Sequence, residues 1–359
     1  MKQKINCLQY GSMMVMIIAS SFIGIGVYSL IKATGVDAYL SILMAIVIAI
    51  PLLLLFLYIA NYEPDLVFPE KLEKLYGKKV GKFVNYMVLI FIFIFANNYM
   101  FNLTNFIVSQ FLPETPIFVI GVVFSIIAIY ANVLGIETMS RTCLILLAIN
   151  LLLLVIGVIG LLPKFQFSNL KPILEFGIGR PLKATFYLIT LNIMPMFALL
   201  IIPKNNVVEP KKFNRYVSLS YLIGLLIAFT FCIMLLGVLG IHLASIYQFP
   251  EYILLKHVNL FGFLDRIENI IAAQWIFGLF FDITFAVYYI AHSIKPNHNS
   301  KLLPTVIVTL MLFVSIFLIP NNTAFNTYTY EIVPLLRVFS LIVFIIIGIS
   351  IFIKQKKNS

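Results

Sequence analysis

Long apolar stretches separated by short polar connections dominate the chain. A membrane-spanning helix needs about 20 predominantly apolar residues, and ten stretches of the sequence meet that requirement. They cover residues 10–31, 38–60, 83–111, 115–134, 139–162, 182–203, 216–241, 266–292, 302–320 and 332–353. The pattern predicts an all-α polytopic membrane protein with ten transmembrane helices.

The composition supports this fold class and leaves no room for a soluble domain. Of the 359 residues, 62% are hydrophobic and 11% are charged, whereas a soluble domain carries about 25% charged residues. The longest polar connections run to about 20 residues, so we expect a single transmembrane permease-like domain over residues 1–359.

Side chains that carry catalysis or bind metal ions are scattered along the chain. Cys7, Cys143 and Cys232 lie far apart and show neither redox nor metal-ligand spacing. The four histidines do not cluster either, and no nucleophile stands at a characteristic spacing from a base. We therefore expect no enzyme activity, no cofactor and no metal site.

The positive charges predict the orientation in the membrane. The net charge of +11 does not indicate nucleic acid, because membrane proteins collect Lys and Arg on cytoplasmic loops. With ten spans and both termini inside, 17 of the 25 Lys and Arg fall on inside segments. The other eight are Lys32, Lys164, Lys171, Arg180, Lys183, Lys256, Arg266 and Arg337. This bias predicts that both termini are cytoplasmic.

The first span contains the sequence Ala19-Ser-Ser-Phe-Ile-Gly-Ile-Gly-Val27. Gly lowers helix stability by about 1 kcal/mol relative to Ala, and Ser competes for main-chain hydrogen bonds. A break here would place unpaired main-chain groups at membrane depth, as in transporter helices that bind small charged ligands. The alternative is that these small residues only let another helix pack closely.

The third span carries several polar side chains, namely Asn97, Asn98, Tyr99, Asn102 and Asn105. Polar groups in a membrane tend to face the bundle interior or a water-filled cavity. Asn98, Asn102 and Asn105 share one helical face. Because Asn side chains also link neighbouring helices, we favour that role for Asn102 and Asn105. Asn98 and Tyr99 are nearer mid-span and are candidates for a ligand site.

The sixth span is interrupted by Thr190-Leu-Asn-Ile-Met-Pro195. Pro195 removes a main-chain donor and disfavours helix at Met194, while Thr190 and Asn192 add hydrogen-bonding groups. The interruption follows the first by five spans, which is the pattern of an inverted-repeat transporter site. A simple proline kink is the alternative.

Acidic side chains are scarce at membrane depth. Asp282 in the eighth span is the one that we place well inside the membrane, which makes it a functional candidate. Alternatively, it lies near the cytoplasmic end and pairs with a lysine or with main-chain donors. Arg266 and Glu268 begin the same span. No Asp or Glu lies deep in spans one to seven, which argues against strong ion coupling.

The connection between the second and third spans is the most charged region. Its run Pro69-Glu-Lys-Leu-Glu-Lys-Leu-Tyr-Gly-Lys-Lys79 predicts a short amphipathic helix at the cytoplasmic interface. Its lysines can face anionic lipid headgroups, but we favour the simpler interpretation that they form a solvated face of this helix.

Two sets of residues resemble known families. The Ser-Phe-Ile-Gly-Ile-Gly and Asn-Ile-Met-Pro breaks, with ten spans, resemble the amino acid–polyamine–organocation transporter superfamily. Within it, Phe249-Pro-Glu-Tyr-Ile-Leu-Leu-Lys256 followed by Phe261-Gly-Phe-Leu-Asp-Arg-Ile-Glu268 is similar to the spore germination permease family. Members of that family are the B subunits of nutrient germinant receptors. The second pair of stretches is the more specific signal, and the resemblance covers the whole chain.

The resemblance implies a LeuT-like 5+5 inverted repeat, with repeat one over about residues 10–162 and repeat two over about 182–353. It implies that a small germinant, usually an amino acid, binds between broken spans one and six. The protein would act with an A and a C subunit in the spore inner membrane, where binding triggers germination.

A clamp for a zwitterion follows from that arrangement. The N–H groups that begin the second half of span one would face a carboxylate, and carbonyls of residues 190–194 would face an ammonium. The ligand-binding candidates are Ser20, Ser21, Phe22, Ile23, Gly24, Gly26, Asn98, Tyr99, Thr190, Asn192 and Met194. Pro195, Arg266, Glu268 and Asp282 are candidates for a structural or signalling role.

An ion-coupled amino acid permease is the alternative function. The scarcity of ionisable groups in spans one to seven favours a sensor. Asp282 and Glu268 are ionisable groups that an ion-coupled permease could use, so this second function stays an alternative.

Overall fold

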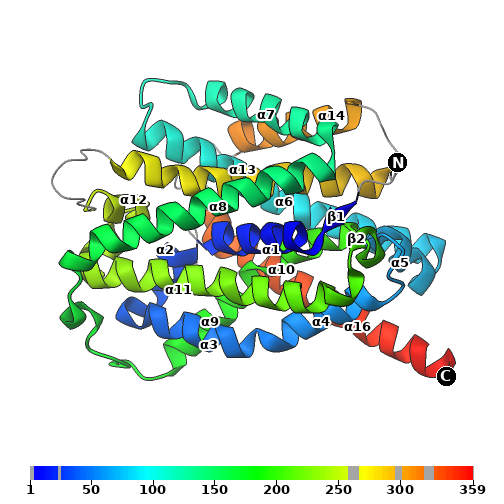
Figure 1. Cartoon of the computed structure of the whole chain (residues 1–359), viewed down its shortest axis with the longest axis horizontal. Helices are drawn as coiled ribbons and strands as arrows, with labels where there is room; N and C mark the ends of the chain where they lie inside the picture. The colour runs from blue at the N-terminus through cyan, green and yellow to red at the C-terminus, as the bar shows by residue number, and fades with distance from the viewer. Residues whose placement is uncertain (1–3, 23–25, 258–266, 296–300, 319–326, 359) are drawn as a thin grey trace.

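The computed structural model describes residues 4–22, 26–257, 267–295, 301–318 and 327–358. These residues are almost wholly helical. Two short strands, β1 Ile5–Asn6 and β2 Val207–Val208, pair in parallel. The strand pair and the end of the last helix lie at the same end of the molecule (Figure 1).

The helices of the first half of the chain follow one another through short connections. They are α1 Cys7–Ser21, α2 Val27–Thr34, α3 Ala38–Ile48, α4 Ile50–Asn61, α5 Phe68–Tyr76, α6 Lys78–Gln110, α7 Ile117–Leu134 and α8 Ile136–Leu161. The 3₁₀ turn η2 Gly35–Asp37 joins α2 to α3, and η3 Leu162–Lys164 and η4 Phe167–Leu170 follow α8.

The second half has the same helical character. Its helices are α9 Gly179–Leu191, α10 Ile193–Ala198, α11 Phe213–Ile246, α12 Pro250–Leu255, α13 Ile267–Ile294, α14 Leu302–Phe313 and α16 Val333–Asn358. Short 3₁₀ turns precede α11, namely η5 Leu199–Ile201, η6 Lys204–Asn206 and η7 Pro210–Lys212. The π-helical segments η8 Val314–Leu318 and η9 Tyr328–Ile332 flank the last connection.

Eight segments in the described part of the chain are long and apolar enough to cross a membrane. They are Val27–Ile48, Lys78–Gln110, Ile117–Leu134, Ile136–Lys164, Gly179–Ile201, Pro210–Ile246, Ala272–Ile294 and Val333–Lys357. The shorter apolar helices are Cys7–Ser21, Ile50–Asn61 and Leu302–Phe317. The predicted all-α, multi-pass membrane protein is therefore confirmed.

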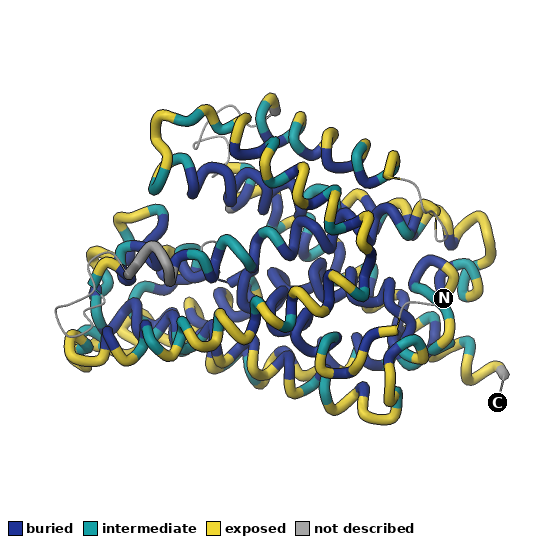
Figure 2. The backbone as a smooth tube through the Cα atoms, turned by 45° about the horizontal axis from the view of Figure 1, so that its top comes forward, coloured by how far each residue is buried: buried dark blue, intermediate teal, exposed yellow. Residues whose placement is uncertain are grey.

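Two groups of helices meet at α1. On one side α6, α7, α13 and α14 pack against one another, and on the other α3 packs against α9 and α11. Helix α1 contacts α8, α11 and α13 and lies in the middle of the molecule, between α7 and α14 at one edge and α3 at the other (Figure 1). Thirteen of its fifteen residues are buried, as expected for a helix that other helices surround. Figure 2 shows that the buried parts of the chain gather in the middle of the molecule and the exposed parts at its edges.

Local chemistry explains where α1 begins and how closely it packs. The Asn6 side chain accepts a hydrogen bond from Gln9 N at 2.7 Å, and Gln9 Oε1 accepts one from Asn6 N at 2.9 Å, which forms a capping box. A Cβ atom at Gly224 of α11 would lie 2.8 Å from Ile18 Cβ. Only a glycine therefore allows this approach of α11 to α1.

The amphipathic helix α5 forms as predicted, but Lys71 faces neither solvent nor lipid headgroups. Its side chain is 3% exposed, and its Nζ donates hydrogen bonds to Ile59 O at 3.1 Å and Ala60 O at 2.8 Å. These carbonyls belong to the last turn of α4, where a cation interacts favourably with the helix dipole. Burial lowers the pKa of Lys71 from its usual 10.5 to about 8.

Candidate functional site

The first helix break lies between α1 and α2. Phe22 directly after α1 and Gly26 directly before α2 both have right-handed helical dihedrals. Gly26 sits where the two interrupted spans touch, because a Cβ atom there would lie 3.0 Å from both Leu191 Cδ2 and Phe22 Cδ2. Ile23 and Gly24 lie outside the described residues.

The second break is smaller than the sequence predicts. A single residue, Asn192, separates α9 from α10, and its dihedrals stay in the right-handed helical region. Met194 is helical, contrary to the expectation. The reason is that Pro195 falls in the first turn of α10, where its missing N–H would have had no partner within the helix. Thr190 Oγ1 donates to Tyr187 O of its own helix at 2.7 Å.

The end of α1 is tied to two other helices through its paired serines. Ser20 Oγ lies 2.5 Å from Asp282 Oδ2 of α13. Ser21 Oγ accepts a hydrogen bond from Tyr99 Oη of α6 at 2.7 Å and donates one to Ile17 O at 2.6 Å. All four polar side chains are at most 6% exposed. The structure thus brings together four predicted site residues from three helices.

The Ser20 hydroxyl has more than one acceptor but a single proton. Its Oγ lies 2.8 Å from Met16 O as well as 2.5 Å from Asp282 Oδ2. When the hydroxyl donates to Met16 O, the short contact to Asp282 requires a proton on the carboxyl group. The Ser20 hydroxyl can therefore pair with the Asp282 carboxyl group in either of its protonation states, as donor to the ionised form or as acceptor from the protonated form. Asp282 Oδ1 has no hydrogen-bond partner among the described residues.

A narrow cavity of about 20 Å³ lies beside this network. This is room for about one water molecule. Its walls come from α1, α6, α10 and α13. They include the predicted site residues Tyr99, Met194, Pro195 and Asp282, with Phe95 beside Tyr99. The rings of Phe95 and Tyr99 meet edge to face at a centroid distance of 4.3 Å.

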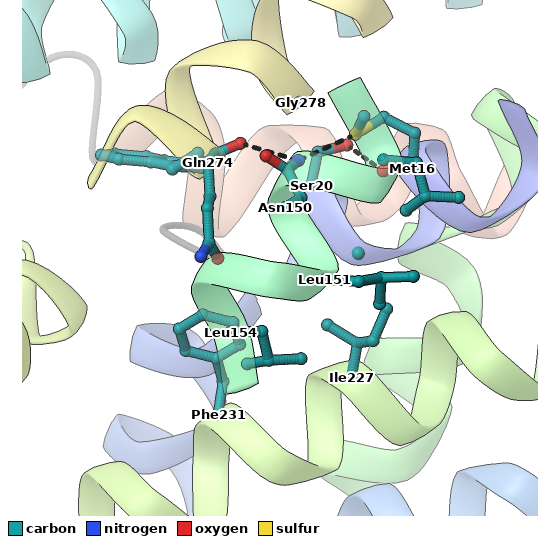
Figure 3. A pocket seen from close by; sticks show the side chains of 12 residues that line it. Met16, Ser20, Asn150, Leu151, Leu154, Ile227, Phe231, Gln274 and Gly278 are labelled. Atoms are coloured by element: carbon teal, nitrogen blue, oxygen red, sulfur yellow. Dashed lines mark hydrogen bonds between the residues drawn. The ribbon is translucent and has the colours of Figure 1, made fainter. Parts of the chain in front are cut away.

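A second cavity, of about 30 Å³, adjoins Ser20 between α1, α8, α11 and α13 (Figure 3). Asn150 Nδ2 of α8 donates to Gln274 O at 3.4 Å and lies 3.4 Å from Met16 Sδ. Asn150 Oδ1 and Gln274 Nε2 are buried without a partner among the described groups. Polar atoms in a cavity of this size suit bound water. In the sequence, Asn150 stands out only as a polar residue within its span, which assigns it no role.

Several predicted residues lie away from the breaks or outside the described part of the chain. Asn98 Nδ2 donates to Thr329 Oγ1 at 2.7 Å and so joins α6 to η9. Its role in ligand binding stays a prediction. Arg266 lies outside the described residues, and Glu268 belongs to α13 but its side chain is likewise outside them.

Arg337 of α16 is a buried cation. The count of Lys and Arg residues in the sequence assigns it to a segment on the outer side of the membrane. It is 2% exposed, and its Nε and Nη1 atoms have no hydrogen-bond partner among the described groups. Its guanidinium carbon lies 5.4 Å from the ring centre of Tyr187 and 5.9 Å from that of Phe95. The sequence did indicate this burial, because Arg337 falls inside the apolar stretch 332–353.

Comparison with known proteins gives consistent matches. A sequence model of the family described as "Spore germination protein" matches residues 4–326. Spore germination protein A2 of Bacillus subtilis is 25% identical over 289 residues, which cover 78% of each chain. Spore germination protein KB of the same species is 25% identical over 262 residues, 71% of this chain and 69% of that one. Spore germination protein XB of Bacillus anthracis is 23% identical over 258 residues, 70% and 71% of the two chains.

Proposed function

We propose a function on the premise that this chain belongs to the spore germination protein family, whose model matches most of its length. This family consists of membrane proteins and is not an enzyme class. The protein acts as the B subunit of a spore nutrient germinant receptor. It binds a small germinant, an amino acid, between the two helix breaks, and binding signals germination.

The observation that carries this proposal is the polar network at the end of α1. Ser20 and Ser21 hold the first break against Asp282 of α13 and Tyr99 of α6, and the second break touches it at Gly26. Buried polar side chains at a helix break are what a transporter fold uses to bind a small ligand near mid-membrane. In this proposal main-chain carbonyls of residues 190–194 face the ammonium group, including Asn192 O, which also accepts from Met196 N at 3.1 Å.

The finer architecture belongs to the same proposal. In this proposal α1 and α2 form one span, α3 and α4 form another, and α14 with η8 forms a third, which gives ten spans in all. These form a LeuT-like 5+5 inverted repeat, with repeats over about residues 10–162 and 182–353. The protein resides in the spore inner membrane with both termini cytoplasmic, and A and C subunits are its partners.

Thermal stabilisation of the purified protein by the common amino acids tests the proposal, because a ligand raises the melting temperature according to its concentration relative to Kd. Uptake into proteoliposomes is measured on the same preparation. We expect stabilisation by a few amino acids without accumulation. No stabilisation by any of them would contradict amino acid binding.

An ion-coupled amino acid permease is the second candidate, and the Ser20–Asp282 pair favours it. This carboxyl group at membrane depth can hold or release a proton where two helices meet. Ion-driven accumulation in the same vesicles would support the permease and contradict the sensor.

A further inference from the structure

A basic cavity opens between α2 and α9. Its volume is about 690 Å³, within the range of small-molecule sites. Lys32, Arg180 and Lys183 line it, and its lining contains no Asp or Glu among the described residues. None of these three cations forms a salt bridge with a carboxylate in the described part of the chain. Cations that line a hollow attract anions into it.

Tyr187 connects this cavity to the interior. It lines the cavity, and its hydroxyl lies 3.5 Å from Ser29 Oγ of α2. The guanidinium carbon of Arg337 lies 5.4 Å from the centre of the same ring. Arg337 is therefore a buried positive charge that contacts Tyr187, one of the residues that line the cavity.

Arg337 also adjoins the candidate ligand site. Its guanidinium carbon lies 5.9 Å from the ring centre of Phe95, which lines the narrow cavity with Tyr99 and Asp282. The ring of Tyr99 meets the same Phe95 ring at a centroid distance of 4.3 Å, and Tyr99 lines the narrow cavity together with Asp282. The interior thus holds a cation and a carboxyl group around one tyrosine, and such a pair complements the two charges of a zwitterion.

A buried guanidinium without a carboxylate is costly unless a counter-charge arrives. Arg337 has neither an ion pair nor partners for Nε and Nη1 among the described residues. Among the described residues, the titratable side chains near it are Tyr187 of α9, Tyr99 of α6 and Tyr328 of η9, with the Asp282 carboxyl group on the far side of Tyr99. Guanidinium groups bind carboxylates through paired N–H donors in a fixed planar geometry.

We propose that Arg337 binds the carboxylate of the germinant and that the basic cavity lined by Lys32, Arg180 and Lys183 is the route by which this anionic group reaches it. This inference rests on the proposed function and names its substrate class as carboxylate-bearing small molecules. Arg337 adds a fixed positive side chain to the main-chain groups at the breaks.

Thermal stabilisation of the full-length protein in detergent tests the inference. The probes are the common amino acids, the amide of each, acetate and propionate, and detergent micelles that contain phosphatidylglycerol. We expect amino acids to stabilise the wild type and their amides to have no effect. Losing a charge-assisted hydrogen bond costs about 1.5–3 kcal/mol, so Arg337→Gln raises the apparent Kd about 10- to 100-fold. Arg337→Lys, which keeps the charge, falls between wild type and Arg337→Gln.

The exposed residues of the cavity provide a second test. Substitutions there leave the buried core unchanged, so a loss of binding cannot be attributed to misfolding of the interior. We expect the double variant Arg180→Gln/Lys183→Gln to weaken binding of the stabilising amino acid at low salt and to lose much of its salt dependence. Lys164→Gln, an exposed lysine that does not line the cavity, is the matched control and should behave like wild type.

The outcomes separate the inference from the proposed function. Equal stabilisation by amino acids and amides, or an unchanged apparent Kd in Arg337→Gln, overturns the role of Arg337 and leaves amino acid binding intact. Stabilisation by acetate or propionate alone, lost in Arg337→Gln, supports the inference and contradicts the amino acid. No stabilisation by any probe contradicts both. Stabilisation only by phosphatidylglycerol, lost in the double variant but kept in Arg337→Gln, would make the cavity a lipid headgroup site and overturn the route.

Discussion

The two interrupted spans touch each other but are held in different ways. The end of α1 is fixed by side-chain hydrogen bonds to other helices, from Tyr99 to Ser21 and between Ser20 and Asp282. The polar groups of the second break make no such bond in the described part of the chain. Thr190 bonds its own helix, and Asn192 Oδ1 is buried without a partner there.

This difference indicates which break moves. Displacing α1 would break hydrogen bonds between buried groups, and leaving a buried partner unpaired costs about 1–3 kcal/mol. Residues of the second break, such as Leu191, Met194 and Phe197, are buried in apolar contacts, and the hydrogen bond from Tyr10 Oη to Leu199 O at 3.2 Å holds the residue that follows α10 rather than the break itself. We infer that the first break is the fixed half of the proposed ligand site and that α10 is the half that would respond to a ligand.

The largest effect is expected where α13 meets the fixed break. A Cβ atom at Gly278 would lie 2.6 Å from Ser20 Cβ, so Gly278→Leu must push α13 away from α1. Overpacking of this kind costs about 1–3 kcal/mol, and we expect it also to abolish stabilisation by amino acids. Gly179→Ala is the control, because a Cβ atom at Gly179 would have nothing within 4 Å. A Gly278→Leu variant that melts and binds like wild type would refute this close contact.

Asp282→Leu removes the polar contact but leaves α13 in place. The loss of a hydrogen bond to an ionisable group, about 1.5–3 kcal/mol, should speed amide hydrogen exchange in the last turn of α1 by about 10- to 100-fold. Exchange in α10 should change little. Asp282→Asn, which can still donate to Ser20 Oγ, is the matched control. Equal effects at both breaks would remove the distinction between them.

Tyr99→Phe tests the second tie at a smaller cost. The ring and its contact with Phe95 remain, and only the hydrogen bond to Ser21 Oγ is lost. A neutral hydrogen bond contributes about 1 kcal/mol, so exchange around Ser21 should rise about fivefold. Phe95→Leu serves as a comparison that alters the ring pair and keeps the hydroxyl. No change in Tyr99→Phe would assign the fixation of α1 to Asp282 alone.

The sequence is sufficient for the fold class and for part of the site. Apolar length predicts membrane helices directly, and polar residues within them, such as Ser20, Tyr99 and Asp282, are recognisable as candidates. Their pairing is not predictable, because it depends on the rotation and packing of α1, α6 and α13 against one another. The second break is overestimated because the effect of Pro195 depends on whether it falls in the first turn of a helix.

Charged residues show the same limit. Rules that count charges on connections place both Arg337 and Lys71 at membrane-flanking positions. Both are buried in the structure. Their partners, the ring of Tyr187 and the carbonyls of α4, come from other helices. Such partners cannot be identified from the local pattern of the chain.

Thr190→Val should have a small effect at the second break. Among the described residues the hydroxyl bonds only to Tyr187 O within α9, a local bond that adds little to helix stability, and valine has nearly the same shape, so the change in stability should lie near the low end for a hydrogen bond, about 0.5 kcal/mol. Amino acid binding should persist, because the proposed acceptors there are main-chain carbonyls. Ser21→Ala is the matched change at the fixed break and should be the more damaging of the two. A Thr190→Val variant that loses binding would make its hydroxyl a ligand contact.

Lys71 lies outside both breaks and bonds α5 to the end of α4. We expect its titration to change the stability of the protein with pH and to leave ligand binding unchanged. Its pKa is about 8 in the folded protein because of burial, against about 10.4 in an unfolded chain. Below pH 8 both states hold the proton. Between about pH 8 and 10.4 the unfolded chain binds more protons, so this group makes stability rise with pH, by up to about 1.4 kcal/mol per unit. Melting temperatures of wild type and Lys71→Met should therefore diverge across that window. Parallel curves would contradict the burial of the Lys71 ammonium group. A pH-dependent change in ligand affinity that disappears in Lys71→Met would show instead that Lys71 and α4 influence ligand binding at the breaks.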